Sequence, residues 1–357
     1  MSLYRKSSLF RGGFVVLLKK VSIYFPLIFS LFLITSCSTS TDVSTKRLSL
    51  GAWVVYWDGN RGMDELEKNS GLFSKVSLFA YEMGPNGSPR HAPKTKDLIP
   101  RFIALAKQQS FSPWVTIVND TRIADDKVLL KDLELTRKLC SDSALIRSHV
   151  VEIADMVQRD GFSGLDLDYE RLEAEDQENF RLLVKEFSNE LKKRGLGFNI
   201  TLEPLRGPLP LPGTLPITVM GYNQYGTHSG PGPRATPEFL EKIGKRVAPF
   251  SNGRLELAIA VAGFSWTEGG KTKQIDWGEA QKLYSSARVE RSLFTKVPHV
   301  KLSTGTEIWF DDADSMKAKL DAALRAGYSG IMIWRLGGND ESLFKILREY
   351  RKEVNAR

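Results

Sequence analysis

The sequence predicts an α/β protein built as a (β/α)8 barrel, also called a TIM barrel. Short runs rich in β-branched and aromatic residues alternate along the chain with amphipathic helical stretches. Eight such runs fall within about 300 residues, which favours a closed barrel over an open sheet. The composition, 42% hydrophobic and 26% charged over 357 residues, provides the core that a fold of this size needs.

The eight runs are the expected barrel strands. They span residues 52–57, 75–81, 112–118, 164–170, 197–203, 216–222, 256–263 and 330–336. After the fourth run, apolar residues from Phe180 to Leu191 follow the i, i+3, i+4 spacing of a helix, which Gly195 is placed to end. Before the eighth run, Asp312 can cap a helix that Gly327 closes.

Two connections depart from a regular β/α repeat. The link between the fifth and sixth runs is the proline-rich stretch LRGPLPLPGTLP, which predicts that one crossover helix is missing or degenerate. The segment 264–306 is longer than a plain loop, so we expect a small insertion between strands 7 and 8. In barrels of this kind the active site lies at the carboxyl ends of the strands.

Residues 1–36 have the pattern of a bacterial signal peptide. A basic region is followed by the apolar segment VSIYFPLIFSLFLI and by small residues before Cys37. Residues 34–37, Ile-Thr-Ser-Cys, resemble the lipobox of bacterial lipoproteins, in which the cysteine is acylated and the chain is cut before it. An uncleaved anchor helix is the alternative, although Lys19 and Lys20 interrupt the apolar stretch.

Both interpretations place the rest of the chain outside the cytoplasm, in the cell envelope. We expect a membrane anchor at Cys37, a polar tether over residues 37–48 and the barrel over residues 49–357. Ser38 follows the cysteine, where Asp would have suggested retention at the inner membrane, so the outer membrane is the expected destination.

The charge of the chain does not indicate a nucleic-acid partner. The formal net charge is +8, but residues 1–36 carry five basic and no acidic side chains, and without them the net charge is +3. No sequence motif of a nucleic-acid-binding fold occurs, so we expect no nucleic-acid binding.

Cysteine and histidine patterns predict neither a disulfide framework nor a metal site. Apart from Cys37 the only cysteine is Cys140, which lies at an apolar helical position and is expected to be a small buried side chain. The four histidines are far apart and show no metal-ligand spacing. We expect no metal and no cofactor.

The fourth run carries an unusual row of acidic residues. In SGLDLDYERL, Asp166, Asp168 and Glu170 occupy every second position, so in a strand they share one face. A water-exposed acidic face fits an edge strand but fits a parallel barrel strand poorly, because both faces of such a strand are covered. The pattern therefore favours three carboxylates inside the barrel, with Glu170 nearest the mouth, and a catalytic role.

These motifs resemble glycoside hydrolase family 18, the chitinase-like hydrolases. The family pattern D-x-x-D-x-D-x-E on the fourth strand is matched here by S-G-L-D-L-D-Y-E, in which Ser163 replaces the first Asp. The sixth-strand motif appears as Met220, Tyr222 and Asn223, where many members have Asp in place of the asparagine, and the eighth-strand tryptophan as Trp334. The stretches after Tyr222 and before Trp334 resemble the branch that contains bacterial spore-cortex and cell-wall enzymes.

The resemblance implies a role for each catalytic position. Glu170 would be the general acid and base, and the substrate's own acetamido oxygen would be the nucleophile, which gives a retaining reaction without a second catalytic carboxylate. Asp168 would orient the acetamido group and Tyr222 would hydrogen-bond its oxygen. Asp166 would share a proton with Asp168, and the two carboxyls would raise the pKa of Glu170.

Three further residues are expected to contact the sugar. Trp334 would form the floor under the sugar at the cleavage point, with core packing as the alternative. Asn223 would hydrogen-bond the sugar, although it cannot carry the charge of the aspartate found in many members. Trp53 would line the cleft, with core packing equally compatible.

The resemblance and the signal pattern together predict a lipid-anchored glycosidase. Its substrate would be an N-acetylglucosamine-containing polysaccharide with β-1,4 linkages, either peptidoglycan or a chitin-like oligosaccharide. The alternatives are a catalytically inactive carbohydrate-binding lipoprotein and an endo-β-N-acetylglucosaminidase that acts on N-glycans. A purely structural lipoprotein is disfavoured because a buried acidic row would then serve no purpose.

Overall fold

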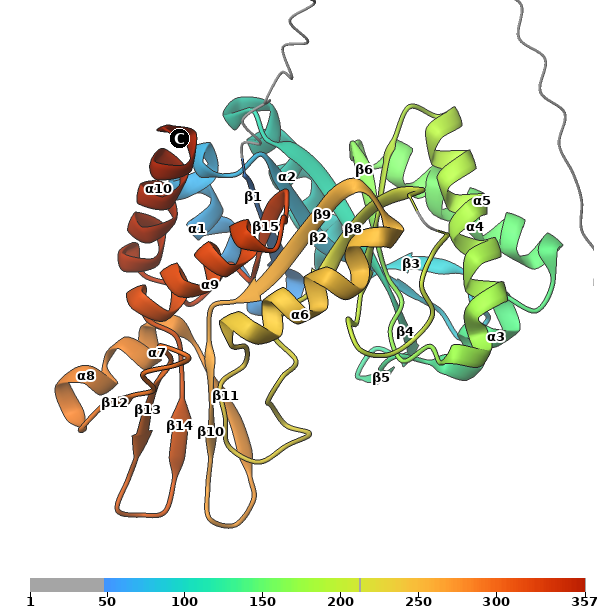
Figure 1. Ribbon diagram of the computed structural model, residues 1–357. Helices are drawn as coiled ribbons and strands as arrows, with labels where there is room; N and C mark the ends of the chain where they lie inside the picture. Colours follow the sequence, from blue (N-terminus) through green and yellow to red (C-terminus); the bar gives the residue numbers. More distant parts are fainter. Residues whose placement is uncertain (1–47, 212, 357) are drawn as a thin grey trace, which may run out of the picture. The chain divides into compact units, whose positions relative to one another are not determined.

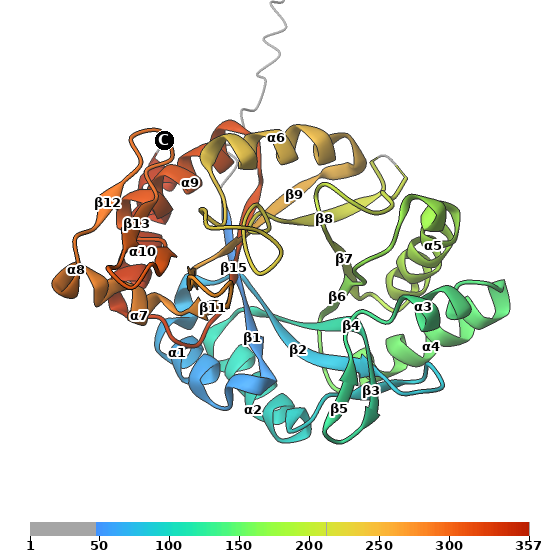
Figure 2. The same cartoon turned by 90° about the horizontal axis from the view of Figure 1, so that it is seen from below.

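Eight parallel strands close into a barrel in the order in which they follow one another along the chain (Figures 1 and 2). The computed structural model describes residues 48–211 and 213–356, so the predicted signal peptide, Cys37 and most of the tether lie outside the described residues. The barrel strands are β1 (Ser49–Val55), β2 (Lys75–Met83), β4 (Ser112–Ala124), β6 (Gly164–Asp168), β7 (Gly197–Leu202), β8 (Leu215–Met220), β9 (Ser251–Ala260) and β15 (Gly330–Trp334).

Pairing between the first and last strands closes the ring. Strand β1 pairs in parallel with β2 on one side and with β15 on the other, and β2 also pairs in parallel with β4. All eight predicted strands are present, and the predicted (β/α)8 fold is confirmed. Short antiparallel strands, β3 (Pro89–His91) and β5 (Lys127–Leu129), extend β2 and β4 beyond the ring.

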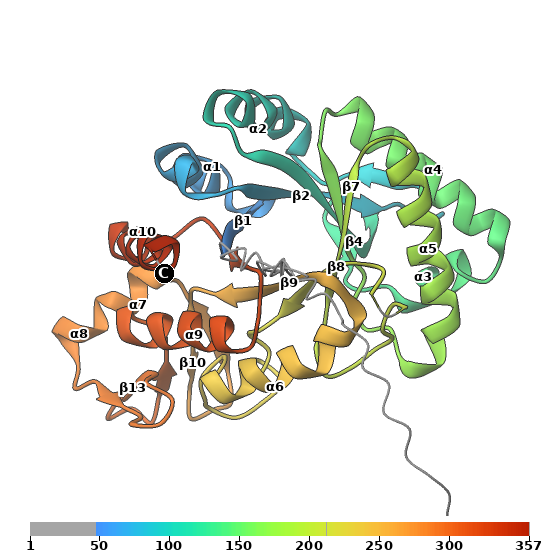
Figure 3. The ribbon, with the colours of Figure 1, turned by 45° about the horizontal axis from the view of Figure 1, so that its top comes forward.

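Helices surround the barrel on its outer side, as Figure 3 shows. They are α1 (Arg61–Asn69), α2 (Thr95–Gln109), α3 (Leu133–Leu139), α4 (Ser143–Arg159), α5 (Gln177–Lys193), α6 (Pro237–Val247), α9 (Ala313–Arg325) and α10 (Glu341–Ala356). The side chain of Asp312 accepts a hydrogen bond from the backbone of Ser315, and so caps α9 as predicted. Cys140, just after α3, is buried as expected.

The two irregular connections are also as predicted. No helix joins β7 to β8 in the described part of that connection, where prolines remove backbone donors. Between β9 and α9 lies a five-stranded antiparallel sheet with two short helices. Its elements are β10 (Gly263–Trp266), β11 (Thr272–Ile275), α7 (Trp277–Gln281), α8 (Leu283–Ser286), β12 (Glu290–Arg291), β13 (Pro298–Lys301) and β14 (Glu307–Trp309).

The core has an outer layer and an inner layer. The outer layer, between strands and helices, holds most of the buried apolar side chains, as expected for strands covered on both faces. A smaller apolar cluster lies inside the barrel and packs against Tyr222 and Trp334. It contains Trp53, Val55, Phe79, Val118, Ala258 and Met332. Within residues 48–211 and 213–356, no helix has the length and apolarity needed to span a membrane.

Candidate active site

The acidic row lies inside the barrel, as the alternation of residues predicted. Leu165 and Leu167 of β6 and the following Tyr169 are buried in the outer core, where their side chains face the helices. Asp166 is 0% exposed and Asp168 is 5% exposed on the inner side. Strand β6 ends at Asp168, so Glu170 stands two residues beyond the strand, at its carboxyl end, where a partly exposed side chain can meet a ligand.

Asn119 holds the backbone of Glu170 in place. Its amide nitrogen donates to the carbonyl oxygen of Glu170 at 3.0 Å, and its amide oxygen accepts from the backbone N–H of Glu170 at 3.0 Å. Asn119 lies on β4, the neighbour of β6, and is fully buried. The side-chain amide thus replaces the strand pairing that ends at Asp168, and it fixes the position of the glutamate.

Lys131 forms an ion pair with Glu170. The ammonium nitrogen lies 2.6 Å from Oε1 of Glu170 and 3.8 Å from Oδ1 of Asp120. The backbone N–H of Lys131 donates to the same Asp120 oxygen at 2.9 Å. Burial lowers the pKa of Lys131, but the negative charges of Asp168, Glu170 and Asp120 outweigh burial and raise it above its usual value, so the side chain is cationic.

Asp166 belongs to a polar network deep in the barrel. Its Oδ1 accepts from the amide of Asn199 at 2.8 Å and lies 3.7 Å from the ammonium of Lys75, which is itself 2.6 Å from Glu256. Burial raises the pKa of Asp166, while the charge of Lys75 acts in the opposite direction. The motif pattern did not indicate Lys75, Asn199 or Glu256, because they come from three other strands.

Asp168 has no such cation in direct contact among the residues that the structure describes. Burial raises its pKa well above the usual range, and the neighbouring charge of Glu170 raises it further. Oδ1 of Asp168 and Oδ2 of Asp166 are buried without a hydrogen-bond partner in the described part of the chain. The proton predicted to be shared between these two carboxyls therefore stays a prediction.

Tyr222 and Trp334 lie next to the acidic row. The two rings stack, with their centres 6.2 Å apart and an angle of 18° between their planes, and both side chains are partly exposed. Burial and the charge of Asp168 raise the pKa of Tyr222 well above its usual value, so its hydroxyl stays protonated and can donate a hydrogen bond. Asn223 follows Tyr222 and is also partly exposed, and its amide contacts the sulfur of Met220 at 3.7 Å.

The structure corrects the expectation for Trp53. This side chain is 2% exposed, and its indole N–H donates to Thr116 inside the barrel at 3.1 Å. Its ring meets the ring of Trp334 edge-on at 5.7 Å, so it supports that residue from within the core. A direct contact with sugar would require exposed surface that Trp53 does not have.

Trp57 is a further aromatic residue beside Trp334, and no sequence pattern indicated it. It is 50% exposed, and its ring centre lies 6.4 Å from that of Trp334 and 5.5 Å from that of Phe79. Trp53 and Trp57 lie in the same predicted strand, and β1 ends at Val55, so Trp57 falls in the turn at the carboxyl end. Trp53 is a core residue because it lies within β1, and Trp57 is a surface residue because it lies beyond the end of that strand.

Ser163, which stands where the family pattern has its first Asp, lies at the far end of the row. Ser163 precedes β6 and is exposed, and its backbone N–H donates to the carbonyl oxygen of Pro113. Because Ser163 stands at the amino end of the strand, it lies away from Glu170.

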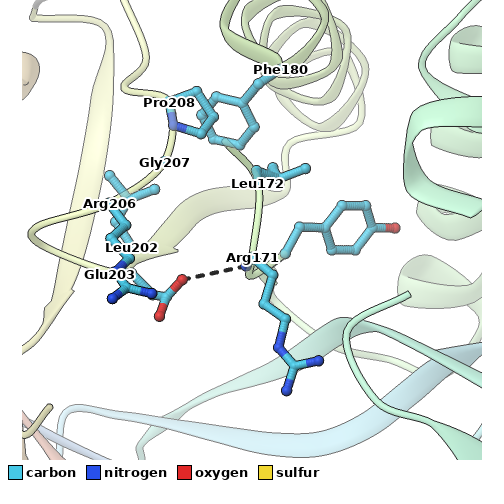
Figure 4. Close-up of a pocket in the computed structure, with 9 residues that line it drawn as sticks. Arg171, Leu172, Phe180, Leu202, Glu203, Arg206, Gly207 and Pro208 are labelled. Carbon is cyan, nitrogen blue, oxygen red and sulfur yellow. Dashed lines mark hydrogen bonds between the residues drawn. The ribbon is translucent and has the colours of Figure 1, made fainter. Parts of the chain in front are cut away.

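A small pocket of about 230 Å³ lies beside the end of the row (Figure 4). Its lining includes Arg171, Glu203 and Arg206, and the backbone N–H of Arg171 donates to Oε2 of Glu203 at 3.3 Å. The pocket lies where the crossover helix between β7 and β8 is missing. It adds charged side chains next to the mouth of the barrel, although it does not contain the carboxylate of Glu170.

Comparisons with known proteins agree with the fold and with the resemblance. No family model matches the chain. The curated relative YvbX of Bacillus subtilis (strain 168), an uncharacterised glycosylase, is 19% identical over 325 residues, which cover 85% of this chain and 92% of the relative.

Two solved structures illustrate the likeness in fold. A class V chitinase from Pseudomonas fluorescens Pf-5 has a TM-score of 0.72 and 19% identity, and the match covers 85% of this chain and 99% of the chitinase. The spore cortex-lytic enzyme SleL of Bacillus cereus has a TM-score of 0.70 and 16% identity over 85% of this chain and 74% of SleL. The predicted resemblance to chitinase-like hydrolases of glycoside hydrolase family 18 is confirmed.

Proposed function

We propose that this chain is a glycosidase that cleaves β-1,4 linkages next to N-acetylglucosamine in peptidoglycan or chitin-like oligosaccharides. The observation that carries the proposal is the buried acidic row that ends at Glu170, at the carboxyl end of β6 and next to the stacked Tyr222 and Trp334. The similarity to chitinases and to a cortex-lytic enzyme supports this substrate class.

The proposed reaction uses one protein carboxyl as acid and base. Glu170 gives its proton to the glycosidic oxygen as the bond from that oxygen to the anomeric carbon breaks. The acetamido oxygen of the same sugar attacks the anomeric carbon and closes an oxazolinium ring. Glu170 then removes a proton from a water molecule that opens the ring, which restores the acid and retains the anomeric configuration.

Asp168 and Tyr222 would hold the acetamido group in place. The carboxyl of Asp168 accepts the acetamido N–H, and the protonated hydroxyl of Tyr222 donates to the acetamido oxygen as it attacks. Asp166 lies beneath Asp168 and is tied to Lys75 and Asn199, so it would hold Asp168 from below. The attack is intramolecular within the sugar, and positioning of this kind holds the acetamido oxygen in line with the anomeric carbon, which contributes to the rate enhancement.

Trp334 would support the sugar at the cleavage point. The aromatic face can pack against the apolar face of a pyranose ring, and the neighbouring Trp57 would extend this surface along the glycan. Asn223 would hydrogen-bond a sugar hydroxyl.

The test compares the purified full-length chain with Glu170→Gln on N-acetylglucosamine oligomers and on purified peptidoglycan. Products are resolved by mass spectrometry. Loss of the acid should lower the rate at least about 10²-fold. Glu178→Gln is a matched control, because its side chain is 80% exposed on α5 and lies outside the row. This control should cleave at the rate of the unchanged chain.

The masses of the products identify the bond that is cleaved. Cleavage of both substrates by the Glu170→Gln variant at the normal rate would contradict the proposed acid. Saturable binding of sugar without cleavage by the unchanged chain would instead favour the carbohydrate-binding alternative. Cleavage confined to N-glycans would favour the endo-β-N-acetylglucosaminidase alternative.

We also propose that the enzyme is held at the cell envelope through a lipid on Cys37. This proposal rests on the sequence pattern of residues 1–37. Incorporation of a labelled fatty acid into the chain, compared with Cys37→Ala, is the test. Equal labelling of both chains would contradict the anchor.

A further inference from the structure

A buried cation with no anionic partner among the described residues lies beside the proposed catalytic tyrosine. Arg234 is 8% exposed, and two of its side-chain nitrogens, Nε and Nη1, are buried with no hydrogen-bond partner among the residues that the structure describes. Its guanidinium carbon lies 5.3 Å from the ring centre of Tyr222 and 4.8 Å from that of Phe264. Contacts with aromatic faces stabilise a cation only in part, and a buried charge without an anion is costly.

The acidic residue whose charge acts on Arg234 already has other partners. The negative charge of Asp311 acts on Arg234, but the carboxylate of Asp311 lies 2.6 Å from the ammonium of Lys319 and also accepts from the hydroxyl of Ser315. Within residues 48–211 and 213–356, Arg234 therefore lacks the bidentate carboxylate partner that an arginine usually has when it is buried.

The loop that carries Arg234 is held in place by hydrogen bonds. The backbone N–H of Gln224 donates to the carbonyl of Arg234 at 3.1 Å, and the side-chain oxygen of Gln224 accepts from Thr236 at 2.8 Å. The indole N–H of Trp266, on the inserted sheet, donates to the carbonyl of Ser229 at 3.1 Å. This loop follows β8, and the contact of Arg234 with the ring of Tyr222 places its side chain beside the candidate active site.

We propose that Arg234 binds a carboxylate of the substrate, so that the preferred glycan is an acidic acetamido polymer containing muramic acid rather than neutral chitin. The inference rests on the proposed glycosidase function and narrows its substrate class. Muramic acid is a glucosamine that carries a lactic acid ether, and its carboxyl group lies within a few ångströms of the acetamido group.

The chemistry of the guanidinium favours a carboxylate over a neutral group. A sugar hydroxyl would satisfy one N–H but would leave the positive charge without compensation. A carboxylate satisfies two N–H groups in parallel and also compensates the charge. Burial lowers the pKa of Arg234 to about 10, so the side chain still carries its charge at neutral pH.

The test measures binding, so that it does not depend on turnover. In the Glu170→Gln background of the full-length chain, calorimetry compares an oligomer of alternating N-acetylglucosamine and N-acetylmuramic acid with a chitin oligomer of the same length. We expect the acidic oligomer to bind at least about tenfold more tightly. Arg234→Met should bring the ratio of the two dissociation constants close to one, and Arg234→Lys should retain part of the preference.

A ligand-side control keeps the test valid if Arg234→Met does not fold. The methyl ester of the muramic carboxyl group removes the negative charge without any change in the protein, and it should bind the Glu170→Gln chain about as weakly as chitin does. Arg288→Met is the matched control, because it removes an arginine of the inserted segment whose side chain is 91% exposed. It should leave the ratio as it is.

Three outcomes would overturn the proposal. The first is equal affinity of the Glu170→Gln chain for the acidic and neutral oligomers. The second is an Arg234→Met variant in which both affinities fall together, so that the ratio of the two dissociation constants is unchanged. The third is an ester that binds as tightly as the free acid. The last two would mean that Arg234 only packs between the rings. Failure of the proposed glycosidase function is read separately, from the cleavage assay with Glu170 intact.

Discussion

The ammonium nitrogen of Lys131 lies 2.6 Å from Oε1 of Glu170, so the proposed acid rests against a cation. A cation at this distance stabilises negative charge. To act as an acid, Glu170 must carry a proton when the sugar is bound. The ion pair therefore has to loosen as the substrate enters, and Lys131 opposes the first step of the proposed reaction.

Replacement of Lys131 by Met should raise kcat/KM. Asp120, Asp168 and Tyr222 are the other charged or titratable groups around this ion pair. Loss of the cation removes the ion pair that the proposed acid has to break before it can act, so kcat/KM at neutral pH should rise by about tenfold.

Lys127→Met is the control for the Lys131 experiment. It removes an exposed lysine from the neighbouring β5 and should leave kcat/KM as it is. Lys131→Arg should keep the normal kcat/KM, because the charge is retained. A kcat/KM of Lys131→Met equal to that of the unchanged chain would show that the ion pair does not bear on the acid.

Replacement of Asn119 by Ala should lower kcat about tenfold and leave KM within about threefold. The two hydrogen bonds from this amide hold the backbone of Glu170, while the aromatic surface that would bind sugar belongs to other strands. Steady-state kinetics on one oligomer measures both constants.

Asn119→Asp separates positioning from a general loss of structure. The carboxylate can still accept from the backbone N–H of Glu170 but cannot donate to its carbonyl, so kcat should lie between those of the unchanged chain and Asn119→Ala. An increase in KM with normal kcat would contradict the positioning role.

The sequence predicts the fold well because the fold depends on local patterns. Strand periodicity, the capping residue Asp312 and the proline-rich link each act within a few neighbouring residues. The acidic row is found for the same reason, since alternation along β6 alone decides which side chains face inward.

The partners of the row could not be found in this way. Lys131, Asn119, Lys75 and Arg234 come from four different segments and meet the row or its neighbours only when the barrel closes. No local spacing marks them. A lone lysine or arginine is most often a solvated side chain, and only the geometry shows that Lys75, Lys131 and Arg234 are largely withdrawn from water.

Replacement of Trp53 should lower stability, and replacement of Trp57 should lower the affinity for sugar. Trp53→Ala removes a fully buried ring and should lower the free energy of unfolding by about 3–5 kcal/mol. Trp57→Ala removes a half-exposed ring next to Trp334, so stability should change by less than about 1 kcal/mol while the affinity for a long oligomer falls several-fold.

Denaturant unfolding and calorimetric titration, both in the Glu170→Gln background, measure the two effects of the tryptophan replacements. Unchanged affinity in Trp57→Ala would remove this residue from the proposed sugar surface. Normal stability in Trp53→Ala would contradict its role in the inner core.

The stability of the barrel should fall in mild acid because of His149. This residue lies on α4, is 3% exposed, and its Nε2 is 2.6 Å from the hydroxyl of Tyr169, which comes between Asp168 and Glu170 in the sequence and faces outward. Burial lowers the pKa of His149 from 6.5 to about 4. Between these two values the unfolded chain takes up a proton that the folded chain does not, so the free energy of unfolding decreases as the pH falls from about 6.5 to 4.

His149→Gln removes this titration and keeps a group that can hydrogen-bond Tyr169. The difference between the pH profiles of the two chains isolates His149 from the carboxylates, which titrate in both. The unchanged chain should lose about 3 kcal/mol more than His149→Gln across this range, as measured by urea unfolding at several pH values. Parallel profiles would mean that His149 takes up its proton in the folded barrel. The contact between His149 and Tyr169 would then open before the barrel unfolds.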